Sequence, residues 1–153
     1  MADRYSQLYI QLVIGVKGRQ NLLQKEWRQE LFKYMSSIIA HKEHKPIIIN
    51  GVEDHVHIFF GLNPSKTIAD LVRDIKSSSS NLVNRKQWVK GKFQWQGGYG
   101  AFSYNHSLVD RVYQYILNQE EHHKKRTFKE EYLDFLKKFE IEYKDQYLFD
   151  WIL

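Results

Sequence analysis

The sequence predicts an α+β domain with a ferredoxin-like (split βαβ) arrangement: an antiparallel sheet with helices on one face, plus additional helices at the C-terminal end. Strand-like and helix-like segments follow one another in the order β-α-β-β-α-β, and two more helices come after them. The chain has 153 residues, of which 42% are hydrophobic, which suits one folded core. No linker or internal repeat divides it, so we expect a single domain over residues 1–153.

The first half of the chain supplies one helix and three strands. Residues 5–16 are β-branched and aromatic with partial alternation, as expected of a strand. Residues 24–41 carry apolar side chains at helical spacing. Residues 46–52 and 53–60 are two further strands, and Asn50-Gly51 between them is a turn signal, which predicts a hairpin.

The second half continues with a helix and a fourth strand. The helix is expected from Lys66 or Thr67 to Arg85, and the serine run 77–80 is expected to mark a break or a loop contact, because serine is a poor helix former. Residues 92–104 are aromatic and interrupted by glycine, which predicts a strand with a kink or bulge.

Two more helices are expected, over residues 107–123 and 127–139, with the tail 141–153 packing back on the domain. Each begins with a capping box, in which a Ser or Thr is followed three positions later by an acidic residue. The boxes are Ser107 with Asp110 and Thr127 with Glu130. This element order leaves the second face of the sheet open.

Composition narrows the classes of function. The chain has no cysteine, which excludes disulfides and a thiolate zinc site and suits the cytoplasm. Its apolar runs are too short to cross a bilayer and no signal peptide is recognisable, so we expect no membrane partner. The net charge of +5 favours a polyanion such as nucleic acid, although a lysine-rich solvated surface explains it equally well.

Two histidines on one strand are the first candidate site residues. Side chains alternate along a strand, so His55 and His57 point to one face and Val56 and Ile58 to the other. Paired imidazoles on a rigid strand can begin a metal site. A lone His-x-His is nevertheless common by chance, so it needs an answering group elsewhere in the chain.

Tyr115 and Gln119 can supply that answer, because residues four apart lie on the same side of a helix. Gln119 could give its carbonyl oxygen to a divalent cation, and Tyr115 could attack a phosphodiester and form a covalent phosphotyrosine. Tyr113 lies roughly 200° away around the helix and cannot serve the same site. Taken alone, such a Tyr–Gln pair is more often structural.

With these motifs in order, the chain resembles the single-tyrosine HUH transposases of small bacterial insertion sequences. The resemblance is carried by His-Val-His, by Tyr-Ile-Leu-Asn-Gln followed by Glu-Glu-His-His, and by the flanking stretches Trp-Gln-Gly-Gly-Tyr-Gly-Ala-Phe-Ser and Phe-Lys-Glu-Glu-Tyr. It implies an enzyme that cuts and rejoins single-stranded DNA at transposon ends, recognises hairpins there and forms a 5′-phosphotyrosine intermediate.

The resemblance also implies roles for individual residues. Tyr115 would be the catalytic nucleophile, and His55, His57 and Gln119 would bind Mg²⁺ or Mn²⁺. It further implies a homodimer in which the tyrosine helix can complete the partner's site, with hinges between Phe102 and Ser107 and after His123.

The densest basic region, between residues 66 and 92, is the expected DNA contact, although a solvated helix face explains most of its charges. The DNA-binding candidates are Arg73, Lys76, Arg85 and Lys92. His122 and His123 are expected to be solvated. Two alternatives stay open: a related HUH endonuclease acting on repetitive palindromes or replication origins, and a non-catalytic module whose histidines stack on bases.

Overall fold

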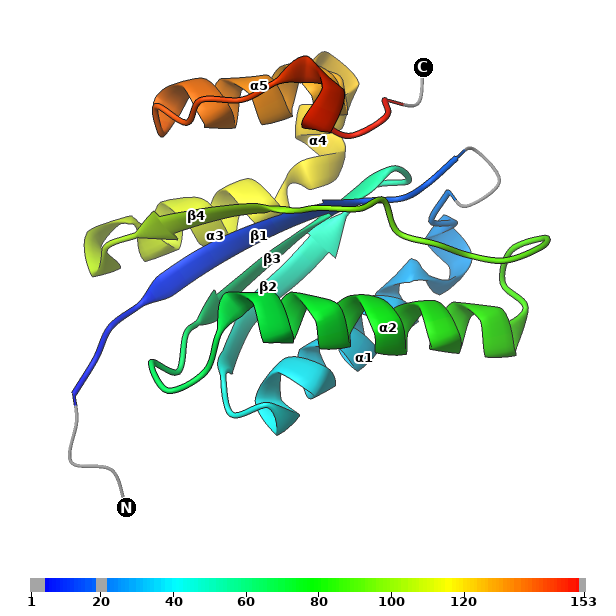
Figure 1. Cartoon of the computed structure of the whole chain (residues 1–153), viewed down its shortest axis with the longest axis horizontal. Coiled ribbons are helices and arrows are strands. Elements are labelled where there is room, and N and C mark those ends of the chain that lie inside the picture. Colours follow the sequence, from blue (N-terminus) through cyan, green and yellow to red (C-terminus); the bar gives the residue numbers. More distant parts are fainter. Residues whose placement is uncertain (1–4, 19–21, 152–153) are drawn as a thin grey trace.

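In the computed structural model, which describes residues 5–18 and 22–151, a four-stranded antiparallel sheet lies between two layers of helices (Figure 1). The strands are ordered β2-β3-β1-β4, which confirms the predicted ferredoxin-like arrangement. The strands are β1 (Tyr9–Gly15), β2 (Lys45–Gly51), β3 (His55–Gly61) and β4 (Gly100–Tyr104). The helices are α1 (Lys25–His41), α2 (Ile68–Lys86), α3 (Val109–Leu117), α4 (Gln119–Lys125) and α5 (Phe128–Lys138). None of these helices is long and apolar enough to cross a membrane.

The main core lies between the sheet and the layer formed by α1 and α2. Alternation along β3 sends Val56, Ile58 and Phe60 into this core, and all three are fully buried. The same alternation turns His55 and His57 toward the opposite face. Burial of aliphatic side chains on one face therefore fixes which side of the sheet the histidines occupy.

The opposite face of the sheet is not open, which corrects the expectation from element order. The helix α3 packs over β2 and β3, with Val112 and Ile116 against Phe59. The helix α5 packs over the other half, where Val13 and Phe102 form a separate core with its aromatic side chains. The two histidines lie beneath this part of the covering layer, where the ring of His57 lies 5.9 Å from that of Tyr115 on α3 and 5.9 Å from that of Phe135 on α5.

The single helix expected over residues 107–123 is broken into α3 and α4 at Asn118. The side chain of Asn50 on β2 donates hydrogen bonds to the carbonyls of Ile116 and Leu117, at 3.0 and 3.1 Å. Carbonyls at a helix end otherwise lack partners, so these bonds stabilise the end of α3 at this point. The start of the helix is also different: Asn105, not a Ser107–Asp110 box, caps the first turn by accepting from the Ser107 N–H.

Other local expectations had mixed outcomes. The capping box of Thr127 and Glu130 at the start of α5 is confirmed. The serine run does not interrupt α2. It makes a loop contact instead, since the Ser79 hydroxyl donates to the Ile75 carbonyl one turn earlier and accepts from the indole N–H of Trp95 in the segment after α2. The strand expected over 92–104 is regular only in β4, with an isolated bridge from Trp95 to Val16 before it.

The β2–β3 hairpin is confirmed, but its turn lies at residues 52–54, because Gly51 is still paired with Val56. The C-terminal tail packs back as expected over the part that the structure describes. Phe149 is buried there, 5.5 Å from the ring of Phe128.

Candidate active site

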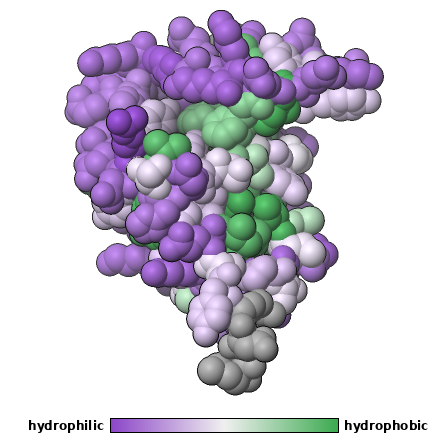
Figure 2. All heavy atoms as spheres, turned by 90° about the vertical axis from the view of Figure 1, so that its left-hand side faces the viewer, coloured by the Kyte–Doolittle hydropathy of each residue, from purple (hydrophilic) through white to green (hydrophobic). Residues whose placement is uncertain are grey.

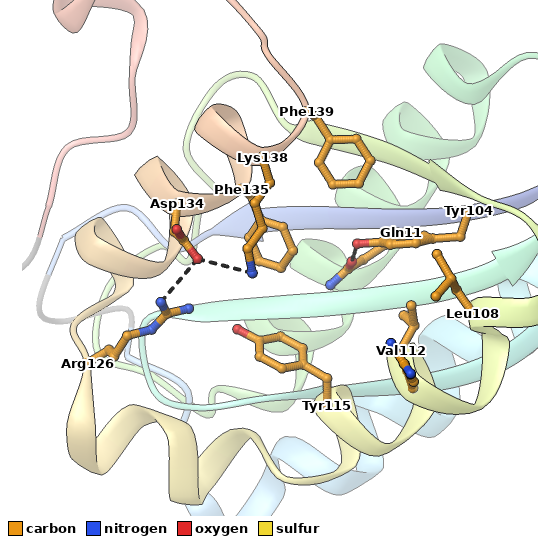
Figure 3. Close-up of a pocket in the computed structure, with 11 residues that line it drawn as sticks. Gln11, Tyr104, Leu108, Val112, Tyr115, Arg126, Asp134, Phe135, Lys138 and Phe139 are labelled. Carbon is orange, nitrogen blue, oxygen red and sulfur yellow. Dashed lines mark hydrogen bonds and ion pairs between the residues drawn. The ribbon is translucent and has the colours of Figure 1, made fainter.

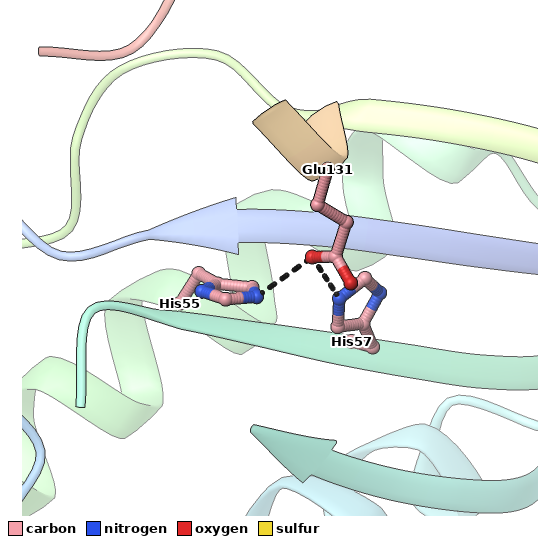
Figure 4. Close-up of side chains that lie close together, drawn as sticks. All are labelled: His55, His57 and Glu131. Carbon is pink, nitrogen blue, oxygen red and sulfur yellow. Dashed lines mark hydrogen bonds and ion pairs between the residues drawn. The ribbon is translucent and has the colours of Figure 1, made fainter. Parts of the chain in front are cut away.

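The two histidines of β3 converge on one carboxylate. His55 and His57 are almost completely buried, and the Nε2 atom of each lies 3.0 Å from Oε1 of Glu131 on α5 (Figure 4). Within the part of the chain that the structure describes, these three side chains form a group that could hold a metal ion. The strand supplies two ligand atoms, and α5 brings a third from more than seventy residues later.

The second nitrogen of each imidazole also has a partner. Nδ1 of His55 lies 2.7 Å from Oδ1 of Asp54, and Nδ1 of His57 lies 2.9 Å from the side-chain amide of Gln11 on β1. Metal-binding histidines commonly have such partners, which fix the ring so that the other nitrogen faces the ion. Asp54 and Gln11 therefore hold both Nε2 atoms toward the same point.

Tyr115 and Gln119 reach the same carboxylate from above. The Tyr115 hydroxyl donates a hydrogen bond to Oε2 of Glu131, and the Gln119 amide donates to that oxygen at 3.2 Å. The structure thus brings together all four residues that the sequence singled out for the site. It does so across the Asn118 break, since Tyr115 lies on α3 and Gln119 is the first residue of α4.

Glu131, which joins these residues, was missed by the sequence analysis. It lies in the apolar stripe of α5 with Phe128, Tyr132 and Leu136, and only 5% of it is exposed. Glu130 beside it caps the helix and is exposed. A charged residue at an apolar position of an amphipathic helix was the signal that could have identified Glu131, because a carboxylate is rarely buried without a partner.

Burial and charge give the two histidines different protonation states. Burial disfavours a charge on His55, but its bonds to Asp54 and Glu131 outweigh burial and raise its pKa to about 9. Burial lowers the pKa of His57, only partly offset by Glu131. Burial would raise the pKa of Glu131, yet the two histidines hold it well below its usual range. Glu131 is therefore an ionised acceptor among four donors.

The phenol of Tyr115 is held in its protonated form. Burial and the charge of Glu131 raise its pKa above the ordinary tyrosine value, while hydrogen bonds from Arg126 and Gln119 act in the opposite direction. His122 stacks on the phenol ring with centroids 4.5 Å apart, and Nε2 of His123 lies 3.4 Å from Oε1 of Glu53. These histidines are half-buried, so the expectation that both are solvated is wrong.

The residues fit a divalent cation. Oε1 of Gln119 is buried and has no hydrogen-bond partner among residues 5–18 and 22–151, although buried polar atoms are usually paired. Two imidazoles, one carboxylate and an amide oxygen are ligands that Mn²⁺ accepts, and Mg²⁺ favours the oxygens among them. The unpaired oxygen, next to histidines already fixed by Asp54 and Gln11, is the observation that supports a metal here.

The expected DNA-binding residues lie on the other side of the sheet. Arg73 and Arg85 are exposed on α2, and Lys92 is exposed in the loop that follows it. Lys76 is half-buried, and its Nζ donates to the carbonyls of Gln96 and Gly98 at 2.8 and 2.6 Å. Burial lowers the Lys76 pKa. These residues belong to the α1–α2 layer, so they do not line the site.

Comparison with known proteins agrees with this fold. Two solved structures share the fold. The first is a protein from Deinococcus radiodurans R1 described as a transposase, with 21% identity and a TM-score of 0.59; the match covers 78% of this chain and 95% of that one. The second is a REP-associated tyrosine transposase bound to a REP hairpin, with 14% identity and a TM-score of 0.57; the match covers 80% of this chain and 74% of that one. No curated protein matches the chain.

The family described as IS200-like transposase matches residues 4–119, well over half of the chain. The matched segment includes both histidines, Tyr115 and Gln119, and ends before Glu131. The chain therefore belongs to the IS200-like transposases, which are DNA transposase enzymes.

Proposed function

We propose that this transposase cuts and rejoins single-stranded DNA at transposon ends through a covalent 5′-phosphotyrosine on Tyr115. The observation that carries the proposal is the convergence of the Tyr115 hydroxyl, the Gln119 amide and both histidine Nε2 atoms on one buried carboxylate. A nucleophile placed beside a potential metal site has the arrangement needed for phosphoryl transfer.

The chemistry of the chain itself is an exchange of phosphodiester bonds. The Tyr115 oxygen attacks phosphorus, the bond from phosphorus to the 3′-oxygen breaks, and the 5′-phosphate stays on the tyrosine. The phenol gives up its proton along its hydrogen bond to Glu131, and the departing 3′-oxygen takes up a proton and leaves as a hydroxyl. Attack by a 3′-hydroxyl on the phosphotyrosine then reseals a strand. One phosphodiester replaces another, so no ATP is needed.

The proposed cofactor is Mg²⁺ or Mn²⁺. His55 and His57 would bind it through Nε2 and Gln119 through Oε1, and Glu131 is placed to add a carboxylate oxygen. A divalent ion supplies charge that polarises a phosphodiester oxygen. For His57 to offer its Nε2 lone pair, the proton must sit on Nδ1. The Gln11 amide, which now presents nitrogen there, would then have to turn its oxygen to that proton.

The proposed substrate is single-stranded DNA with hairpins at the transposon ends. The structural neighbour bound to a REP hairpin supports a hairpin partner. Arg73, Arg85 and Lys92 are exposed and could contact backbone phosphates. We expect less from Lys76, because its ammonium group already donates to two carbonyls.

We also propose a homodimer working in the cytoplasm with its DNA substrate. In the structure, Tyr115 lies beside His57 of its own chain, with ring centroids 5.9 Å apart. The dimer is therefore not needed to complete this arrangement of the site. If the hinges at residues 102–107 and after His123 move, the same tyrosine could serve a partner subunit.

The test is formation of a covalent protein–DNA adduct. The protein is incubated with Mg²⁺ and single-stranded DNA from the flanks of its own gene, and the products are separated on a denaturing gel. We expect an adduct with wild type and with Tyr113→Phe, the matched control on the same helix, but none with Tyr115→Phe. Absence of an adduct with wild type would favour a non-catalytic module, and an adduct with Tyr115→Phe would exclude Tyr115 as nucleophile.

A second candidate function is an HUH endonuclease that processes repetitive palindromes. It shares the site, and the REP-associated structural neighbour is the observation that favours it. The same gel distinguishes the two functions. A transposase cleaves the flanks of its own gene and joins them, whereas the endonuclease prefers palindromes found at many other places in the genome.

A further inference from the structure

A cavity of about 300 Å³ opens beside Tyr115, between α3 and α5 (Figure 3). Its floor is formed by Gln11 of β1 and Tyr104 of β4, and the Tyr104 hydroxyl donates to Oε1 of Gln11 at 2.7 Å. Its walls come from Val112 on α3 and from the aromatic residues of α5. The cavity thus occupies the gap between the two helices that cover the site face of the sheet.

The walls of the cavity are aromatic. Phe139 lies edge-to-face with Tyr104, with centroids 5.5 Å apart, and Phe135 lies edge-to-face with Tyr115 at 5.9 Å. Phe135 and Phe139 are only partly buried, so ring surface is accessible from the cavity. Figure 2 views the side of the molecule where α3 begins and α5 ends, and apolar surface is exposed there between hydrophilic side chains. Accessible aromatic surface is how proteins hold unpaired bases.

The rim of the cavity is cationic. Arg111, Arg126 and Lys138 line it with a single acidic residue, Asp134, which pairs with Arg126 at 3.2 Å and with Lys138 at 3.3 Å. Arg126 and Tyr115 line the same cavity, and Figure 3 shows the guanidinium of Arg126 beside the Tyr115 hydroxyl. A phosphate approaching the phenol would meet this guanidinium, which suits phosphate oxygens.

We propose that this cavity binds one unpaired base of the DNA strand, next to the phosphate that Tyr115 attacks, and that Arg126 contacts that phosphate. The inference rests on the proposed function, because it needs Tyr115 to be the nucleophile. Aromatic walls, a cationic rim and a volume of about 300 Å³ suit one flipped-out nucleotide and exclude a duplex. The amide of Gln11 is buried and held by His57 and Tyr104, so the Tyr104 hydroxyl, whose oxygen can still accept a hydrogen bond, is the group at the floor that can read the edge of a base.

The first test locates the base by photocrosslinking. Single strands from the gene's flanks carry one 5-iodouracil each, moved along the strand, and are irradiated on the Tyr115→Phe variant, which holds DNA without cutting it. We expect one position to crosslink to Tyr104, Phe135 or Phe139, as mapped by mass spectrometry. Crosslinks that fall only on the α1–α2 layer would overturn the inference.

The second test measures binding. Phe139→Leu keeps an apolar side chain but removes the aromatic surface, so it should weaken binding of the same strand about 5- to 150-fold. An abasic nucleotide at the crosslinked position should weaken wild-type binding similarly and have no further effect on Phe139→Leu. The control is Tyr147→Ala, which removes an aromatic ring that is 75% exposed and does not line the cavity. Circular dichroism confirms that each variant folds.

The inference and the proposed function can fail separately. If wild type forms the covalent adduct but Phe139→Leu binds as tightly as wild type, the cavity holds no base and the proposed function stands. If the strand crosslinks to the cavity and Phe139→Leu weakens binding, but wild type forms no adduct, base binding stands and the proposed function falls.

Discussion

The two faces of the sheet differ in the side chains that they bury and in the helices that cover them. Facing α1 and α2, β3 presents Val56, Ile58 and Phe60, and the covering helices have 17 and 19 residues. Facing α3, α4 and α5, it presents His55 and His57, and the covering helices have 9, 7 and 11 residues. One face buries a continuous apolar core beneath two long helices, whereas the other buries ionisable groups between two smaller apolar clusters beneath three short ones.

This difference indicates that one face of the sheet contributes mainly to stability and the other mainly to catalysis. Burial of apolar surface favours folding, whereas a buried charge costs free energy unless it is paired and hydrogen-bonded. On the site face the cost is limited because Glu131 accepts from four donors. We therefore expect substitutions on the α1–α2 face to change mainly stability, and those on the site face to change mainly activity.

The largest expected effects come from His57 and Ile58, which are neighbours on β3 and face opposite sides of the sheet. Removing the proposed metal ligand in His57→Ala should lower adduct formation more than about 100-fold, since even residues that only support a ligand account for 10–100-fold effects. Hairpin binding should be largely retained.

Ile58→Ala should instead lower the free energy of unfolding by about 2–5 kcal/mol, with near-normal adduct formation at low temperature. Urea unfolding and the adduct gel measure the two quantities. Loss of hairpin binding in His57→Ala would show that the histidine is structural.

Asp54→Asn should give the next largest effect. It removes the carboxylate that holds His55 Nδ1, so Mn²⁺ affinity should fall about 10–100-fold. Thermal unfolding over a Mn²⁺ titration measures this, because an ion that binds only the folded state stabilises it. The matched control is Asp74→Asn on α2, where Asp74 pairs with Lys42. Equal Mn²⁺ affinity in both variants would contradict a metal at His55.

Two threonine caps, one on each face of the sheet, allow the faces to be compared with substitutions that should cost the same folding free energy. Thr67 caps α2 and Thr127 caps α5, each accepting a backbone hydrogen bond three residues on. Each change to Ala should cost about 1 kcal/mol of folding free energy, measured by urea unfolding. Only Thr127→Ala should also slow adduct formation, since α5 positions Glu131. If Thr67→Ala slowed it equally, the two faces would not be separable.

The smallest expected effect is on the pH dependence of folding stability, and it comes from His44. It is buried at the end of α1, against Phe60, and its Nδ1 accepts from the Asn63 N–H. Burial and the charge of Lys66 lower its pKa, while Glu43 opposes this. The unfolded chain therefore takes up the proton first as pH falls, and stability is lost below the ordinary pKa of about 6.5. Urea unfolding at pH 7 and 5 should show a smaller loss for His44→Gln than for wild type. An equal loss would show that His44 does not contribute.

The sequence was informative where the determinants are local. Alternation along β3 placed His55 and His57 on one face, and helical spacing placed Tyr115 and Gln119 together. The break at Asn118 was not predictable in this way, because Asn50, which holds the end of α3, lies 66 residues before Ile116. The covering of the second face and the role of Glu131 likewise arise from packing between distant segments.

The position of Glu131 also sets when the site can exist during synthesis. Its contacts with His57 and His55 span 74 and 76 residues, so the histidines emerge from the ribosome long before their partner. At rates of about 5–20 residues per second, the gap is roughly 4–15 s. The α1–α2 layer can begin to fold in that interval, while the cluster that holds Tyr115, the proposed nucleophile, is still incomplete. A nascent chain is therefore folded in part before it can cut DNA.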